Sequence, residues 1–439
     1  MAGLGNNVLV VGEPRLGWLV DGVAETPPIS VLLRDTGNDV ELTVPLGPLG
    51  ARKGAYEGWF DSAAAPTGGP VQQDIYPRIP RQLLVEDVHG AVVLVGCSFG
   101  SVRQSFHAGQ GKIIANFAVL GARRLDYGQI DGMRMEVPAL ARWMRFRGSE
   151  WVVQRHRDGR VKSASIELPE SETTVLSEAL ELSAVTTWRT ARPEAGKFFV
   201  REQVLVETRR ASAVSWDEHL AAHDALLDLI SLSAWRPFGI ARLQVRREDD
   251  VVAPDGRARW LDVVTHWLPE HEAWASDPKF LFHFAQIDVD GVARWCQLRT
   301  DYADAVGPMM SVLRSAHQWS HASVVQSGVA LENLGYLIEV KKNEGRRLNA
   351  RGQISFRGAL GAIIEDMEDV PLEDVDRWKM RAIECYMGAK HPDRATPDAA
   401  VMGETLRENL LVVRYWVALQ VGASPESLRS ALATDLLRP

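Results

Sequence analysis

The chain has 439 residues, of which 46% are hydrophobic and 24% are charged. This balance is typical of globular domains and excludes a mainly disordered protein. At about 150 residues per domain, the length predicts two or three domains. Acidic side chains outnumber basic ones by 57 to 49, which gives a net charge of −8. The protein is therefore not a general nucleic-acid coat, and any phosphate contact must come from a local basic cluster.

The three cysteines, Cys97, Cys296 and Cys385, lie far apart in the sequence. Their odd number and wide spacing exclude a disulfide framework and a Cys-x-x-Cys metal knuckle. A reducing, cytoplasmic location fits best. The first residues lack the pattern of a signal peptide, and no stretch approaches the ~20 apolar residues of a membrane span. We therefore expect no membrane association.

Residues 1–165 predict a β domain, because short apolar runs are separated by turn residues. Residues 29–44 form a predicted hairpin whose loop is 35–39. No helical pattern of 10–15 residues alternates with these strands, which disfavours a parallel α/β sheet. An antiparallel sandwich or open barrel is expected instead.

Residues 166–299 predict a mixed α+β continuation of this region. Residues 198–208 indicate a strand, and Ser215 with Glu218 forms a capping box that opens a helix. Four later runs are interpreted as strands: 241–247, 259–267, 279–287 and 293–299. They extend the first sheet or build a second layer.

Over residues 300–439 the apolar period changes to 3.6, which predicts a bundle of five or six helices joined by short loops. The fold class is therefore α+β and multidomain, with the β-rich part first and the helical bundle last.

The first candidate site is His391, at the end of a predicted helix. Lys390 and Arg394 flank it, and Pro392 stops the helix. Imidazole titrates near neutral pH, as proton transfer requires, and the flanking cations can meet a phosphate. The alternative is a cationic cap that complements the helix dipole.

The second candidate is a basic loop with a net charge of +4 within eleven residues. Its cations are Lys341, Lys342, Arg346, Arg347 and Arg351. Such a cluster can hold an RNA backbone, and the alternative is a solvated loop between helices. A third basic group lies on a predicted hairpin and consists of Arg155, Arg157, Arg160 and Lys162. A solvated surface without a binding function is the favoured alternative for it.

Two histidine pairs, His219/His223 and His317/His321, have the i,i+4 spacing that places two imidazoles on one helical face. Neither pair has the glutamate of an HExxH motif, and the sequence selects no third ligand. Packing beside neighbouring tryptophans explains them better, so we expect neither a metal nor another cofactor. A metal-dependent hydrolase is the weakest of the functional alternatives.

Several segments, in their order along the chain, resemble the ApeA-like antiviral proteins of bacteria. The segments are Gly17-Trp18-Leu19, 29–37, 92–99, 117–144, 215–240, 329–337 and 383–393. The resemblance implies an N-terminal mostly-β domain that senses or regulates and a C-terminal HEPN helical domain. It also implies a metal-independent endoribonuclease of the abortive-infection kind, acting on tRNA or other single-stranded RNA. A homodimer through the helical domain and a phage-derived trigger are the implied partners.

In the family, an arginine and a histidine of an RNxxxH-like motif meet at the dimer interface, and residues 383–393 lie where that motif is placed. Only His391 matches, because the arginine positions hold Glu384, Cys385 and Tyr386. The nearest upstream arginine is Arg381, which on an ideal helix lies ~15 Å along the axis and roughly 80° around it from His391.

Lys390, Arg394 and Arg381 are therefore substitutes proposed from chemistry. Two functions stay open: an active HEPN ribonuclease, and a catalytically degenerate HEPN domain that binds, senses or assembles.

Overall fold

A computed structural model describes most of the chain. The described residues are 7–23, 28–48, 56–60, 79–146, 150–168, 170–190, 200–251, 258–315, 317–367, 369–391, 393–395 and 397–438. The chain divides into two compact units. The β unit comprises residues 1–136, 206–221 and 239–271, and the helical unit comprises residues 137–205, 222–238 and 272–439. None of the helices within the described ranges is both long and apolar enough to cross a membrane.

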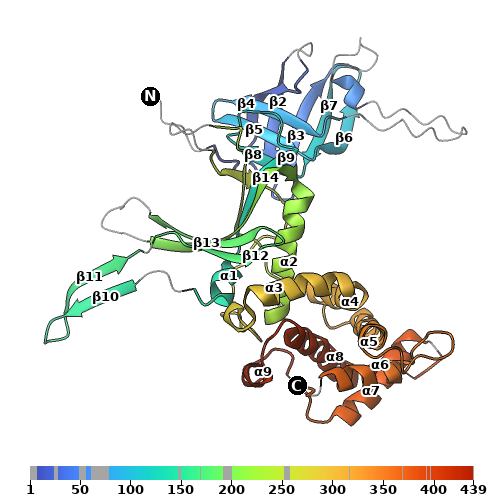
Figure 1. Cartoon of the computed structure of the whole chain (residues 1–439). Coiled ribbons are helices and arrows are strands. Elements are labelled where there is room, and N and C mark those ends of the chain that lie inside the picture. The colour runs from blue at the N-terminus through green and yellow to red at the C-terminus, as the bar shows by residue number, and fades with distance from the viewer. Residues whose placement is uncertain are drawn as a thin grey trace, which may run out of the picture. The chain divides into compact units, whose positions relative to one another are not determined.

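The β unit is built around one large antiparallel sheet (Figure 1). Within this unit the strands follow the spatial order β14-β9-β15-β16-β8-β5-β4-β1-β2-β3-β7-β6, where β14 is Val200–Ser215. They are β1 (Arg15–Val20), β2 (Ile29–Asp35), β3 (Val40–Leu46), β4 (Gln82–Asp87), β5 (Gly90–Val95), β6 (Ser98–Gln104), β7 (Gly109–Ala115), β8 (Phe117–Leu120), β9 (Gln129–Glu136), β15 (Arg242–Arg246) and β16 (Leu261–Val264), with the short 3-10 helix η1 (Glu57–Trp59) between β3 and β4.

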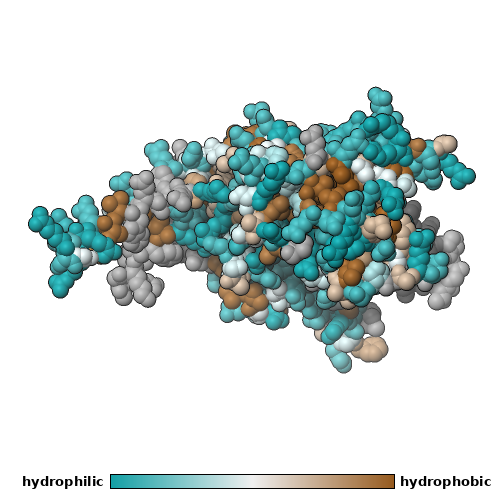
Figure 2. All heavy atoms as spheres, turned by 90° about the horizontal axis from the view of Figure 1, so that it is seen from below, coloured by the Kyte–Doolittle hydropathy of each residue, from teal (hydrophilic) through white to brown (hydrophobic). Residues whose placement is uncertain are grey.

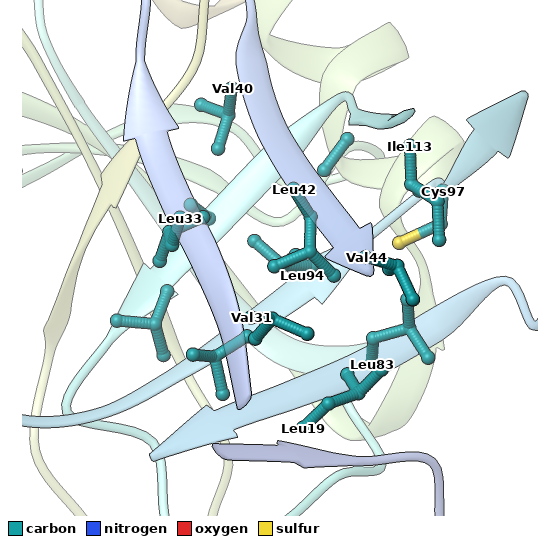
Figure 3. Packing of buried hydrophobic residues seen from close by; sticks show 14 of the residues in the cluster. Leu19, Val31, Leu33, Val40, Leu42, Val44, Leu83, Leu94, Cys97 and Ile113 are labelled. Atoms are coloured by element: carbon teal, nitrogen blue, oxygen red, sulfur yellow. The ribbon is translucent and has the colours of Figure 1, made fainter. Parts of the chain in front are cut away.

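Alternating apolar residues build the core of this sheet, because successive side chains of a strand point to opposite faces. In β2 and β3 every second residue is buried, and the two strands pair antiparallel across the predicted turn. Gly37 has a φ of +87° there, and its backbone N–H donates to the Asp35 carboxylate. Figure 3 shows side chains of β2 and β3 meeting those of β4 and β5, so the sheet bends over onto itself.

This architecture confirms the antiparallel β region that the sequence predicts. One continuous sheet links the strands, which favours the open barrel over two separate sheets. The capping box is also confirmed: the Ser215 hydroxyl accepts from the Glu218 N–H, and the Glu218 carboxylate accepts from Ser215.

The chain crosses between the units along β14 (Val200–Ser215) and along the helix that the capping box opens, α2 (Trp216–Ala234). The helical unit also contains α1 (Pro138–Trp143), β10 (Glu150–Arg155), β11 (Val161–Glu167), β12 (Thr173–Ser177), β13 (Leu182–Thr190), α3 (Phe284–Asp301), α4 (Ala303–Arg314), α5 (His321–Lys342), α6 (Phe356–Met367), α7 (Val375–Lys390), α8 (Ala399–Gln420) and α9 (Pro425–Leu432). Six of these helices, α4–α9, follow residue 300 within the described chain, as the 3.6 period predicts.

The strands predicted over 279–287 and 293–299 are wrong. Residues 279–283 form no regular element, and residues 284–301 are helix α3. A kink at Asp288, with φ +56° and ψ −168°, divides α3 into two pieces. Buried residues recur at helical spacing within each piece: Phe284 and Ile287 before the kink, and Val292, Trp295 and Leu298 after it. The strands predicted over 241–247 and 259–267 are confirmed as β15 and β16.

Helix α5 is the centre of the bundle, where it packs against α4, α6, α7 and α8. Gly335 permits its close approach to α6, because a Cβ at that position would fall 2.4 Å from the Ala359 Cα. Three tryptophans with no exposed surface, Trp295, Trp378 and Trp416, fill the interior. Figure 2 shows a face covered mainly by hydrophilic side chains, with the hydrophobic ones in separate groups.

Candidate functional site

The end of α7 carries the first candidate site. Asp374 caps the start of this helix by accepting from the Arg377 N–H at 2.9 Å. Trp378, Ala382, Cys385 and Tyr386 form its buried stripe. Cys385 is fully buried, as expected for a core residue, and burial raises the pKa of its thiol.

His391 is the C-cap residue of α7, and its side chain is exposed to solvent. Its backbone N–H donates to the Met387 carbonyl, and its carbonyl accepts from the Arg394 N–H at 3.1 Å. Lys390 and Arg394 are also exposed. The helix end therefore presents an imidazole next to two cations, with water access to all three.

A buried tyrosine holds Lys390 in place. The Tyr386 hydroxyl donates to Glu332 on α5 at 2.8 Å, and Lys390 Nζ donates to the same hydroxyl at 3.2 Å. The ammonium also lies 4.9 Å from the centre of the Tyr386 ring. Burial, together with the Glu332 carboxylate, raises the pKa of Tyr386, so this hydroxyl stays a neutral donor. Lys390 is thus positioned, but Glu332 offsets part of its charge at 3.8 Å.

Arg381 has a different environment from the other three residues. Its Nη1 lies 2.7 Å from Glu404 and its Nη2 lies 2.5 Å from Glu408, both on α8, and only 11% of the side chain is exposed. Helix α7 runs unbroken from Arg381 to Lys390, so Arg381 and His391 remain about 15 Å apart along its axis within one chain.

Lys341 and Lys342 of the predicted basic loop end α5, and its three arginines lie between α5 and α6. Acidic residues of the same unit offset most of this charge. Lys341 pairs with Asp301, Lys342 with Asp366 and Arg346 with Glu365, at 2.9–3.3 Å. Arg347 bonds to the fully buried Glu339 and to Glu365. Arg351 is exposed, and it forms no ion pair with any described residue.

The third basic group is confirmed as lying on a hairpin. β10 and β11 pair antiparallel, and Gly159 adopts a φ of +84° in the turn. The strand β11 is exposed along nearly its whole length.

The histidine pairs do not form a metal site in the described structure. Both ring nitrogens of His219 are engaged, by Thr208 at 2.7 Å and by the Ile130 carbonyl at 3.0 Å. His317 precedes α5 while His321 is its first residue, so this pair does not share a helical face. Among the described residues no three His, Cys, Asp or Glu side chains are grouped as metal ligands.

Four acidic partners of these cations are not evident from the sequence: Glu332, Glu339, Glu404 and Glu408. Glu404 and Glu408 stand one turn apart on α8, a spacing that places both on one face. That spacing was visible in the sequence, but nothing there connected it to Arg381 on a different helix.

Two of the three comparisons with known proteins returned nothing: neither the curated proteins nor the solved structures gave a match. The family model of ApeA N-terminal domain 1 matches residues 28–295, which is more than half of the chain. The match ends within α3, so it leaves α4–α9 outside. The chain therefore belongs to the ApeA N-terminal domain 1 family, which indicates an antiphage defence protein.

Proposed function

We propose that the helical unit is the effector of this defence protein, a HEPN-type endoribonuclease that acts on tRNA or other single-stranded RNA. The observation that supports this most is the exposed imidazole of His391 beside Lys390 and Arg394 at one helix end. The β-rich region then senses a phage-derived trigger or restrains the effector.

The reaction needs only an acid/base group and positive charge. His391 accepts the proton of a ribose 2′-hydroxyl, whose oxygen attacks the adjacent phosphorus. Lys390 and Arg394 stabilise the charge of the phosphorane. The bond to the 5′-oxygen then breaks, and this oxygen takes up a proton from an imidazolium. The products are a 2′,3′-cyclic phosphate and a 5′-hydroxyl.

A second copy of the chain supplies the other half of the site in this proposal. One imidazole acts as the base while its counterpart acts as the acid. Exposed apolar residues on α5 are consistent with an interface in the helical unit: Tyr336 is 38% exposed and Val340, one turn later, is 47% exposed. Residues four apart lie on one helical face.

Labelled single-stranded RNA in excess EDTA tests the proposal. The wild-type chain should leave 2′,3′-cyclic phosphate ends, and His391→Ala should abolish cleavage. His317→Ala is the matched control, because His317 is also exposed and lies in the helical unit. RNA that stays intact at high wild-type concentration, or equal loss in both variants, would contradict the assignment.

The alternative is a catalytically inactive HEPN-like module that binds or assembles. The ion pairs favour it. Arg381 is paired with Glu404 and Glu408, and four of the five loop cations form ion pairs with acidic residues of their own unit. Intact RNA together with dimer formation by the wild-type chain would support this function.

A further inference from the structure

Between α1 and β12 the chain forms a hairpin that stands apart from the large sheet. Among the described strands, β10 and β11 pair only with each other, as a separate two-stranded sheet (Figure 1). Five consecutive residues of β11, 161–165, are all exposed. Because neighbouring side chains of a strand point to opposite faces, both faces of the hairpin meet solvent. An isolated hairpin is only marginally stable in water, so packing against the described residues does not explain this one.

Backbone hydrogen bonds fix the turn of this hairpin. The His156 N–H donates to the Arg160 carbonyl at 2.8 Å, and the Gly159 N–H donates to the His156 carbonyl at 3.0 Å. Asp158 completes the turn, because its carboxylate accepts from the Arg160 N–H at 3.0 Å. The only acidic residue of the turn therefore has a structural role.

Positive charge is concentrated at this end of the hairpin. Residues 155–162 contain four cations and one acid, a net charge of +3 in a chain whose total is −8. The cations are Arg155, Arg157, Arg160 and Lys162, and all four are exposed. Arg160 lies 3.8 Å from Asp158, but 86% and 59% of these side chains are exposed, so water screens the pair. Neither Arg157 nor Lys162 forms an ion pair with a residue that the structure describes, in contrast to four of the five cations of the basic loop.

A polyanion fits this charge, and the shape of the hairpin selects which one. Three of the four cations are arginines, whose donors match two phosphate oxygens at once. The major groove of B-form DNA, about 12 Å wide, admits a two-stranded ribbon. In contrast, the major groove of an RNA duplex is too deep and narrow for side chains to read. A groove also contacts both faces of a ribbon, whereas a flat acidic protein surface covers only one.

We infer that the β10–β11 hairpin is a DNA-binding arm that inserts its turn into the major groove of duplex DNA. Arg157, Arg160 and Lys162 contact the phosphates that flank the groove. The arm lies within the region that the family model matches and outside α4–α9. It is therefore separate from the proposed ribonuclease centre, and the inference does not depend on that function.

Fluorescence anisotropy with the full chain and a short labelled DNA duplex of mixed sequence tests the inference. Joint replacement of Arg157, Arg160 and Lys162 by alanine should weaken DNA binding at least tenfold. The dependence of log Kd on log salt should become flatter by about 2.7, or about 0.9 for each lost phosphate contact. The matched control removes the same charge from three exposed cations of other elements and should leave the Kd within twofold: Arg34, Arg103 and Lys279.

Competing polyanions and a groove-specific reagent complete the test. We expect the DNA duplex to bind at least tenfold more tightly than an RNA duplex of the same sequence or polyglutamate of the same charge. Dimethyl sulfate methylates guanine N7 in the major groove and adenine N3 in the minor groove, and the bound chain should protect the guanines. No binding of duplex DNA at low salt, equal weakening in both triple variants, equal binding of either competitor, or protection of adenine alone would overturn the inference.

Two variants separate this arm from the ribonuclease proposal. His391→Ala should leave the affinity for duplex DNA unchanged, because His391 lies at the end of α7. Loss of RNA cleavage and loss of DNA binding are therefore distinguishable results. Loss of DNA binding in His391→Ala to the same extent as in the triple variant of the arm would contradict the placement of the DNA site on the hairpin.

Discussion

Replacement of Arg347 by alanine should destabilise the helical unit far more than the same replacement at its neighbour, Arg346. Arg347 donates to Glu339, a carboxylate with no exposed surface, through its guanidinium and through its backbone N–H at 3.1 Å. Asn343 supplies a third donor at 3.1 Å. Arg346 instead pairs with Glu365, where 60% and 50% of the two side chains are exposed.

The magnitude follows from what each variant leaves behind. In Arg347→Ala the buried carboxylate keeps two donors and loses its charged one, which costs about 2–3 kcal/mol. In Arg346→Ala a solvated ion pair is lost, which costs about 0–1 kcal/mol. Burial favours the neutral form of Glu339, but its hydrogen bonds, the one from Arg347 first among them, lower its pKa below the ordinary 4.5.

A carboxylate with a lowered folded-state pKa stabilises the protein above its unfolded pKa, and this stability disappears as pH falls through the folded value. The difference in the free energy of unfolding between wild type and Arg347→Ala should therefore be largest at neutral pH and become smaller in acid. Urea unfolding followed by circular dichroism, with hydrogen exchange in α5 and α6 as the local readout, measures it. Equal stability of the two variants at pH 7 would refute the assignment of a structural role to Arg347.

Two further predictions concern thiols and glycines. In the folded protein a disulfide reagent should react with Cys296 alone among the three cysteines, since Cys97 and Cys385 are buried and burial raises the pKa of Cys97 to about 12; prompt reaction of all three without denaturant would contradict this packing. Gly335→Ala should destabilise the bundle by about 1–3 kcal/mol through overlap with α6. Gly403→Ala, in α8 with no atom within 4 Å of the added Cβ, should stabilise by roughly 0.5–1 kcal/mol. Thermal unfolding of the Gly335→Ala and Gly403→Ala variants shows whether the first lowers and the second raises the midpoint temperature.

The parts of the fold that the sequence predicted correctly are those in which local signals act alone. The hairpin of β2 and β3 follows from its turn residues, and α2 follows from the Ser215–Glu218 capping box. The error over 279–299 arose because two aromatic-rich runs were considered separately. Helix α3 joins them across a kink at Asp288, where φ is +56° and ψ is −168°, so its buried residues keep helical spacing only within each of its two pieces.

The site was predicted less completely, because charge balance is a tertiary property. A basic segment of net charge +4 is evident from the sequence alone. Its acidic partners are contributed by α3 (Asp301), by the last turn of α5 (Glu339) and by α6 (Glu365 and Asp366). Of these, Glu365 and Asp366 lie in α6, where they pair with Arg346, Arg347 and Lys342.

These ion pairs change what an RNA-binding experiment on the loop can show. A reversal of Arg347 to glutamate would place a second carboxylate beside buried Glu339, so weaker RNA binding could follow from lost structure alone. Arg351 avoids this problem, because it is exposed and forms no ion pair with a described residue. Substitution of Arg351 is therefore the cleaner measure of a phosphate contact, with one fewer counterion released if it binds RNA.

The rigidity of α7 decides which cations can act with His391. A continuous helix fixes the axial separation of Arg381 and His391 at about 15 Å, and Glu404 and Glu408 hold Arg381 on the α8 side. Arg381 could reach a phosphate beside its own His391 only if the helix unwound and two ion pairs broke. The proposed cleavage would therefore rely on Lys390 and Arg394, or on residues of a second copy, whereas Arg381 is held in ion pairs with Glu404 and Glu408.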